Sequence, residues 1–263
     1  MKAWKRIHIT KKRAACGVLG LLLLAAAYMG VPRAAEKVFA VAEGERRLPI
    51  YCVQTEKPQV SVSFDAAWGA DDTDELLRIL KENDVKATFF LCGYWVEKYP
   101  EEVKKIAAEG HDLGNHSATH PHMSRISSEE IAQELQKCHE NVKKLTGVEM
   151  ELFRPPFGEY DNHVIETAEQ NGYYTIQWDV DSLDWKEQGA EVEIRQVLEH
   201  KHLGNGPIIL FHNDAKYTPK VLDTILKGIK EKGFEIVPIS QLIHRENFEM
   251  DHEGRQIPKG KDV

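Results

Sequence analysis

Residues 60–65 read VSVSFD, a β-rich run that ends in a carboxylate, Asp65. Further β-rich runs follow at residues 86–91, 111–116, 151–154, 173–180, 207–212 and 235–239. Between them lie stretches whose apolar residues recur three and four positions apart, which is the period of an α-helix. Strands that alternate with helices in this way predict a parallel α/β architecture, because each helical crossover returns the next strand in the same direction.

Such a body is either an open doubly wound sheet or a closed barrel. No Gly-x-Gly-x-x-Gly follows a predicted strand, which argues against a dinucleotide-binding sheet. Capping signals mark two of the expected helix starts. Asp72 lies three residues before Glu75, and Ser127 or Ser128 opens the longest expected helix.

Charge is distributed very unevenly along the chain. The 263 residues carry a formal net charge of -8. Seven of the 34 Lys and Arg residues, and none of the 42 Asp and Glu residues, lie within residues 1–33, which leaves the remainder strongly acidic. An acidic body does not attract phosphate backbones. We therefore expect no nucleic-acid partner, and a neutral or weakly charged substrate.

Residues 14–31 form an uncharged, apolar stretch that follows six Lys and Arg residues. This stretch is just long enough to span a bilayer, and the basic residues before it should hold the N-terminus in the cytoplasm. The small residues at 40–42 offer a cleavage site for a signal peptidase but lie far beyond the apolar stretch. This favours an uncleaved single-pass anchor in the cell membrane with an extracytoplasmic domain, or a secreted protein if the segment is cleaved.

These patterns divide the chain into four parts. They are a basic stub and membrane segment (1–35), a polar stalk (36–57), an α/β domain (58–242) and a polar tail (243–263). Outside the membrane segment the cysteines are Cys52, Cys92 and Cys138. They form no Cys-x-x-Cys pair for zinc and no disulfide framework, although a bridge between Cys52 and Cys138 stays open.

Polar side chains gather where the predicted strands end. They are Asp65, Asn115, His116, Arg154, Asp179, Asp181 and His212. In a parallel barrel the carboxyl ends of the strands share one face, so residues far apart in sequence become neighbours there. Each predicted strand is apolar until it reaches these groups. We therefore expect one site on this face.

His116 and His120 suit two ligands of a divalent metal, because their spacing of four places both imidazoles on one side of a turn. A surface histidine pair is the alternative, but the strand-end position and the following Pro121 favour metal. Asp65 needs a partner because a charge at the end of a buried strand is costly. Arg154, in the rigid run RPPFG, can supply that partner.

His212 emerges from an apolar strand at the same predicted face. A neighbouring Asp181 would raise the pKa of His212 and make it a general acid. Trp185 follows a cluster of acids at the same rim. It is either part of the barrel core or a platform for a sugar ring.

Five ordered motifs carry a resemblance to a known family: SFD at 63–65, HSxxHP at 116–121, RPPFG at 154–158, DxxDW at 181–185 and LFH at 210–212. Over residues 58–242 the chain resembles the NodB-homology polysaccharide deacetylases, carbohydrate esterase family 4. Its anchor and size are similar to the membrane-anchored deacetylases of Gram-positive bacteria, including the sporulation-associated group. The resemblance implies a distorted parallel (β/α) barrel. It also implies metal-dependent hydrolysis of N-acetyl groups from N-acetylhexosamine polysaccharide, either peptidoglycan or a chitin-like polymer.

The resemblance also assigns roles to single residues. Asp65 would be the general base, oriented by Arg154. His212 would be the general acid, tuned by Asp181. The backbone N–H near Phe157 would help to hold the oxyanion.

The metal and substrate sites follow from the same resemblance. His116 and His120 would hold a divalent metal, zinc in character, with cobalt or another divalent ion as alternatives. Substrate would be bound by Phe157, Asp184 and Trp185, of which Trp185 would form a wall of the acetyl pocket.

One departure from the family pattern concerns the third metal ligand. The family has Asp-Asp-Gly where this chain has Asp65-Ala66-Ala67, and Ala66 cannot bind metal. The missing ligand would be Asp65 itself, a water, or Asp71 or Asp72, or else metal binds weakly. An alternative function is therefore a non-catalytic protein that binds cell-wall glycan or serves sporulation. A glycosidase that uses Asp65 and a second carboxylate is a third possibility.

Overall fold

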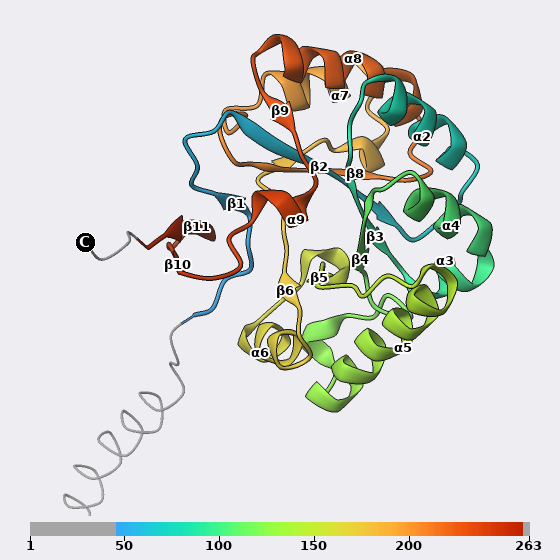
Figure 1. Ribbon diagram of the computed structural model, residues 1–263, viewed down its shortest axis with the longest axis vertical. Coiled ribbons are helices and arrows are strands. Elements are labelled where there is room, and N and C mark those ends of the chain that lie inside the picture. The colour runs from blue at the N-terminus through green and yellow to red at the C-terminus, as the bar shows by residue number, and fades with distance from the viewer. Residues whose placement is uncertain (1–45, 260–263) are drawn as a thin grey trace, which may run out of the picture. The chain divides into compact units, whose positions relative to one another are not determined.

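The computed structural model describes residues 46–259 (Figure 1). The predicted membrane segment and the first part of the predicted stalk, residues 36–45, lie outside the described residues. Within residues 46–259 no helix is long and apolar enough to cross a membrane.

A curled parallel sheet forms the centre of the domain, as the sequence predicts. Its strands lie in the order β6 (Tyr174–Thr175), β5 (Leu152–Phe153), β4 (Asp112–Asn115), β3 (Thr88–Leu91), β2 (Gln59–Ala66), β8 (Ile208–His212) and β7 (Val180–Asp181). A further short strand, β9 (Glu235–Ile236), pairs with the start of β2. Every pairing within this sheet is parallel. The sheet is a distorted (β/α) barrel rather than a flat doubly wound sheet.

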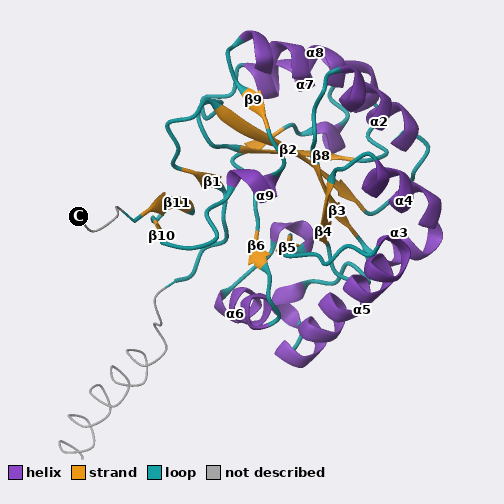
Figure 2. Cartoon of the chain, viewed as in Figure 1, coloured by secondary structure: helices purple, strands orange, loops and turns teal. Residues whose placement is uncertain are grey.

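Helices cover the outer face of the sheet (Figure 2). They are α2 (Thr73–Glu82), α3 (Gly93–Lys98), α4 (Pro100–Ala108), α5 (Ser128–Thr146), α6 (Asn162–Gln170), α7 (Ala190–Leu198) and α8 (Thr218–Glu231). The short helix α9 (Ile239–Leu242) instead packs with the second apolar cluster, which includes Phe90 and Ile208. Short 3-10 turns are η1 (Met123–Arg125), η2 (Pro156–Gly158) and η3 (Asp184–Lys186). The helices α3 and α9 are absent from the sequence prediction, because such short segments show too little of the helical period.

The two predicted caps differ in outcome. Ser127 and Glu130 form a full capping box at the start of α5, so this prediction is confirmed. Asp72 does precede α2, but its side chain makes no cap. The Asp72 carboxylate instead accepts a hydrogen bond from the Asp214 N–H at 2.8 Å.

Alternation along β2 separates the core from the barrel interior. Val60, Val62, Phe64 and Ala66 belong to the apolar core, while Ser61, Ser63 and Asp65 alternate with them. The Phe64 ring stacks on those of Phe89 and Phe211, at centroid distances of 4.9 and 5.7 Å, which ties three neighbouring strands together. Each of these buried rings contributes roughly 1.5–3 kcal/mol to stability. The core thus fixes which face of β2 carries Asp65.

The run 173–180, predicted as one strand, is two short strands at opposite edges of the sheet. Residues between β6 and β7 bridge the gap between these edges. Ile176 donates its N–H to Phe153 O at 2.8 Å, and Gln177 donates to Ile50 O at 2.8 Å. Asp179 then donates to Ile208 O at 3.0 Å. The pattern of apolar residues does not reveal that the neighbouring strand changes within this run, because both halves are extended and buried.

Both predicted boundaries of the domain also differ from the structure. The end of the predicted stalk contains β1 (Cys52–Val53), which pairs with β11 (Arg255–Pro258), and β11 pairs with β10 (Phe248–Met250). The predicted tail is therefore ordered as part of a three-stranded sheet. Gln256 is fully buried there and exchanges hydrogen bonds with the His244 backbone. Because buried polar residues such as Gln256 have their hydrogen-bond partners within the protein, this segment is folded although its sequence is polar.

The cysteines of the described chain are buried and free. Cys52, Cys92 and Cys138 carry no disulfide, so the bridge that the sequence left open is not formed. Burial raises the pKa of the Cys52 thiol to about 12, which keeps it protonated.

Gly206 joins the small sheet to the parallel sheet. Its carbonyl accepts the Val53 N–H at 2.9 Å, and its own N–H donates to Gln59 O at 2.7 Å. Its φ is +91°, and a Cβ at this position would lie 1.8 Å from the carbonyl oxygen of Val53. Only glycine fits this close approach of two backbones.

We expect Gly206→Ala to lower the free energy of unfolding by roughly 2–5 kcal/mol, through left-handed strain and the backbone clash. Gly147→Ala is the matched control, because Gly147 has φ +76° but no atom within 4 Å of an added Cβ. It should cost only about 1–2 kcal/mol. Urea unfolding of the two variants measures the difference, and equal losses would contradict the role given to the Val53 contact.

Candidate active site

Arg154 and Asp65 form an ion pair inside the barrel, the contact expected from the sequence. Arg154 directly follows β5, and its side chain is fully buried. Its guanidinium donates to Asp65 Oδ1 at 2.6 Å, to Ser63 Oγ at 2.9 Å and to Gln177 O at 3.2 Å. It also lies over the Phe90 ring, 4.0 Å from the centroid. These contacts fix the position of the Asp65 carboxylate.

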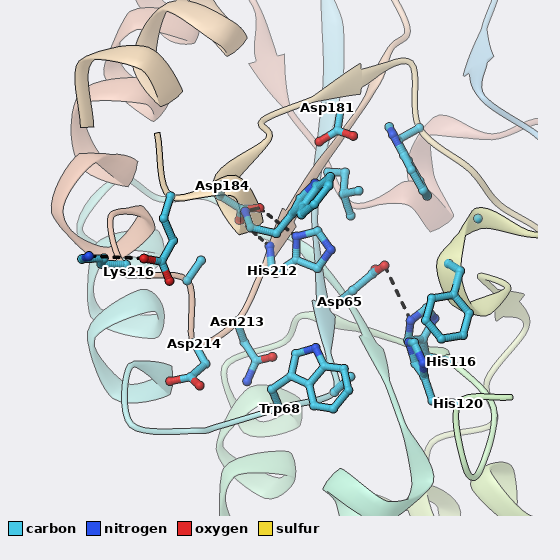
Figure 3. Close-up of a pocket in the computed structure, with 18 residues that line it drawn as sticks. Asp65, Trp68, His116, His120, Asp181, Asp184, His212, Asn213, Asp214 and Lys216 are labelled. Carbon is cyan, nitrogen blue, oxygen red and sulfur yellow. Dashed lines mark hydrogen bonds and ion pairs between the residues drawn. The ribbon is translucent and has the colours of Figure 1, made fainter. Parts of the chain in front are cut away.

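The environment of Asp65 keeps it ionised. Burial would raise the pKa of this carboxyl, but the charge of Arg154, together with its hydrogen bond, outweighs burial, so the pKa lies below its ordinary value. The second carboxylate oxygen lies 3.7 Å from His116 Nε2 and lines the pocket (Figure 3). Asp65 therefore offers one bound and one available oxygen, which is what a general base requires.

The two predicted metal ligands lie together. His116 Nδ1 is 2.7 Å from Arg154 O, so Nδ1 carries the proton and donates it, which leaves a lone pair on Nε2. The His116 and His120 ring centroids are 5.0 Å apart. Burial lowers the pKa of His116, and burial followed by the proximity of His116 lowers the pKa of His120 to about 4. Both imidazoles are neutral at pH 7, as ligands must be.

The residues present nevertheless do not make a complete metal site. Two histidines suit a divalent metal, and the Arg154 carbonyl orients one of them as an outer partner should. Within residues 46–259, however, no group of three His, Cys, Asp or Glu side chains is arranged to hold an ion. Asp72 is engaged by the Asp214 backbone and does not line the pocket. Asp72 therefore does not face the two histidines, whereas the free oxygen of Asp65 lies 3.7 Å from His116 Nε2.

His212 ends β8 and is held by a carboxylate from η3. Its Nδ1–H donates to Asp184 Oδ1 at 2.7 Å, and its backbone N–H donates to Asp184 Oδ2 at 2.6 Å. Burial would lower the pKa of His212, but the hydrogen bond and charge of Asp184 outweigh burial, so the pKa is raised. His212 is therefore able to carry a proton to the pocket at neutral pH.

The partner of His212 differs from the sequence prediction, which chose Asp181. Both acids line the pocket, but Asp184 is 2% exposed and contacts His212, whereas Asp181 accepts the Leu183 N–H at 2.8 Å. The chain turns sharply after β7, with Leu183 at φ +55°, and this turn brings Asp184 back against β8. The direct contact with His212 is thus made by Asp184, while Asp181 raises the pKa of His212 through its charge alone. The spacing of the two acids did not reveal this turn.

A pocket of about 540 Å³ opens where these strands end. It is lined by Asp65, His116, His120, Phe157, Asp181, Asp184, Trp185 and His212, together with Trp68 and neighbouring residues. Of the predicted strand-end residues, Asn115 does not line it: its amide donates to Tyr173 Oη at 3.0 Å. Asp179 does not line it either and pairs with His202 at 2.6 Å. The pocket thus gathers the predicted base, acid and histidine pair, with Arg154 buried beneath.

Aromatic side chains form the rim of this pocket. In the described part of the chain the exposed large hydrophobic residues are Trp68 (62%), Phe157 (56%) and Trp185 (58%), and all three line the pocket. The His120 ring lies between two of them, with centroids 5.8 Å from Trp68 and 4.5 Å from Phe157. Exposing these aromatic faces to water is unfavourable, and such exposed apolar surface is typical of a binding site.

Trp68 was not predicted as a site residue. The available signal was its position, three residues after Asp65 in a loop that leaves the central strand. A large apolar side chain in such a loop, directly before Gly69, is not part of a strand and is therefore not expected to be buried in the core.

Comparison with known proteins identifies the family. Residues 53–176 match the family model described as polysaccharide deacetylase. The peptidoglycan-N-acetylglucosamine deacetylase of Bacillus cereus is 33% identical over 190 residues, which cover 71% of this chain and 68% of that protein. The uncharacterized protein YlxY of Bacillus subtilis is 36% identical over 195 residues, 74% of this chain, and the match spans only 60% of YlxY.

A solved structure extends the likeness to the fold. BA3943 of Bacillus anthracis, described as a CE4 family pseudoenzyme, is 34% identical with a TM-score of 0.71, over 80% of this chain and 70% of that one. A mutant of the same protein is described as having restored enzymatic activity. Fold, motif order and sequence agree: this chain belongs to the polysaccharide deacetylase family.

Proposed function

We propose that this chain hydrolyses N-acetyl groups on N-acetylhexosamine units of a cell-wall polysaccharide, outside the cytoplasm. The observation that carries the proposal is the placement of Asp65 and His212 in one aromatic-rimmed pocket, one ionised and the other able to hold a proton. The B. cereus relative, named as a peptidoglycan deacetylase, supports peptidoglycan as the glycan. The basic and apolar pattern of residues 1–33 supports export and a membrane anchor.

Two residues of the pocket carry out the two proton transfers of amide hydrolysis. Asp65, held ionised by Arg154, takes a proton from a water that attacks the acetyl carbonyl carbon. His212, kept protonated by Asp184, gives a proton to the amine nitrogen as the C–N bond breaks. The products are acetate and a free amino sugar. The rim aromatics provide faces on which a sugar ring can stack.

The histidine pair of the pocket would hold a divalent metal. A divalent metal supplies Lewis-acid polarisation and an acidified water in enzymes that bind one. Here His116 and His120 are ready to bind, but the described residues provide no complete three-ligand group. We propose that zinc, or another divalent ion, binds this pair weakly, because a hard anionic ligand is missing at position 66.

A second candidate function follows from the same gap. Ala66 and the incomplete ligand set favour a protein that binds cell-wall glycan without turning it over. The description of BA3943 as a pseudoenzyme of this family supports this candidate. Both candidates use the aromatic rim, so glycan binding is common to them and acetate release separates them.

Acetate release tests the first candidate. N-acetylated chitooligosaccharide and peptidoglycan, incubated with the chain and excess zinc, should release acetate, and a chelator should stop the release. Asp65→Asn should lower the rate about 100-fold or more, because the general base is lost. It should also cost about 3–5 kcal/mol of stability by leaving Arg154 without a charged partner, so its fold is checked by circular dichroism.

Asp179→Asn is the matched control for that variant. Asp179 also ends an extended run, but it pairs with His202 outside the pocket. Its acetate release should equal that of the unmodified chain. Glycan binding without acetate release at any zinc concentration would instead establish the second candidate.

Calorimetric titration with zinc tests the missing ligand. We expect weak binding by the unmodified chain and at least about 10-fold tighter binding by Ala66→Asp, since a carboxylate at the end of β2 restores the hard oxygen ligand. Ala66 is fully buried, so the fold of this variant is checked by circular dichroism. His116→Ala in that background should abolish the gain. His122→Ala should leave it unchanged, because His122 pairs with Glu159 and does not line the pocket. Tight zinc binding by the unmodified chain would contradict the weak-site proposal.

Trp68→Ala should weaken binding of N-acetylated oligosaccharide roughly 5- to 10-fold, because a stacking face is removed from the rim. Trp68 is largely exposed, so its loss should leave the unfolding transition unchanged. Binding is followed by calorimetry, which needs no turnover. Unchanged affinity would show that Trp68 does not contact the glycan.

A further inference from the structure

A buried hydrogen-bond chain runs behind His212, away from the pocket. Glu193, on α7, is 4% exposed, and its Oε1 lies 2.8 Å from Thr218 Oγ1. Thr218, at the start of α8, is fully buried, and the same hydroxyl lies 3.2 Å from Asp184 Oδ2. Asp184 in turn accepts the Nδ1–H of His212. Four side chains from α7, α8, η3 and β8 are thus connected in a line.

The number of protons in this line restricts its charge state. The Thr218 hydroxyl has one proton and lies between two carboxyl groups, so it can donate to only one of them. If Glu193 and Asp184 were both ionised, one carboxylate would lose its donor and the two buried charges would repel. A neutral Glu193 removes the conflict: its O–H donates to Thr218, and Thr218 donates to Asp184. Every bond in the line then has a donor and an acceptor.

Two further observations support a neutral Glu193. Its second oxygen, Oε2, is buried without a hydrogen-bond partner, which is far less costly for a neutral carboxyl than for a carboxylate. Burial raises the pKa of Glu193 to about 7; the hydrogen bond from Thr218 opposes this shift and the charge of Asp184 adds to it. The group therefore changes charge within the physiological range.

We propose that Glu193 is a positioning residue that, as a neutral acid, acts through Thr218 to direct Asp184 toward His212 and so sets the proton affinity of that histidine. At higher pH Glu193 becomes an anion and adds a second buried negative charge behind Asp184. His212 then holds its proton more strongly. The inference rests on the proposed role of His212 as the group that protonates the leaving amine.

A small set of charged side chains surrounds the hydrogen-bond chain from Glu193 to His212. The charge that acts on Glu193 is that of Asp184, on η3. His212 is faced by Asp184, by Asp65 on β2 and by Asp181 on β7. These three act on His212 directly, whereas Glu193 acts only through Thr218 and Asp184. Breaking the line at Thr218 therefore isolates its effect.

The first test is the pH dependence of stability in the full chain. Glu193 has an ordinary pKa of 4.5 and a folded value of about 7, so its contribution to stability is complete below pH 4.5 and is lost as the pH rises through 7. Glu193→Gln keeps a neutral donor toward Thr218 and cannot ionise. The urea midpoint should fall less between pH 5 and pH 8 in this variant than in the unmodified chain.

Glu191→Gln is the matched control, because Glu191 lies two residues earlier on α7 and is exposed. It should keep the full fall in midpoint. Identical pH dependence in Glu193→Gln and the unmodified chain would overturn the neutral-acid assignment.

The second test follows the His212 Cε1–H resonance by NMR. In the unmodified chain it should show two inflections with pH, one of them near 7 from Glu193. Glu193→Gln should remove that inflection. Thr218→Val should also remove it, while Glu193 still titrates in the stability measurement. Persistence of the inflection in either variant would overturn the coupling. Neither readout needs turnover, so absence of acetate release would count against the proposed function and leave this result unaffected.

Discussion

The buried guanidinium of Arg154 is the constraint on which the rest of the site depends. A charge with no access to water needs close partners, and the two terminal nitrogens of Arg154 find them in Asp65, Ser63 and the Gln177 carbonyl, while its Nε has no hydrogen-bond partner. These partners come from the central strand and from the segment that bridges the open edges of the sheet. The same contacts that make burial tolerable therefore hold the barrel together and aim the Asp65 carboxylate.

The surroundings of the two proton-transfer groups, Asp65 and His212, determine which of them is protonated. Asp65 is as buried as a core residue, but the cation beside it keeps the carboxylate ionised. His212 is also largely enclosed, but the anion of Asp184 keeps its pKa raised. A base that stays deprotonated and an acid that stays protonated can then share one pocket at the same pH. In each case the closest buried partner of opposite charge, Arg154 for Asp65 and Asp184 for His212, makes the largest favourable contribution.

The sequence predicted the features that depend on period and order, and missed those that depend on turn geometry. The parallel sheet, the longest helices and the meeting of Asp65, His116, His120 and His212 all follow from apolar runs that end in polar residues. The partner of His212 could not be predicted in this way, because the turn after β7 brings Asp184, and not Asp181, against the ring. The last sheet strands were missed for a related reason: buried Gln256 is satisfied by backbone groups, so its segment reads as polar.

The loss of a metal ligand at position 66 need not disturb this arrangement. His116 is oriented by the Arg154 carbonyl and Asp65 by the Arg154 side chain, so both are held by the protein itself. These two side chains keep their positions when metal affinity falls, because neither depends on the ion for its orientation. The step between an active deacetylase and a glycan-binding relative can therefore be as small as one side chain on β2. The fold, the pocket and its aromatic rim do not have to change with it.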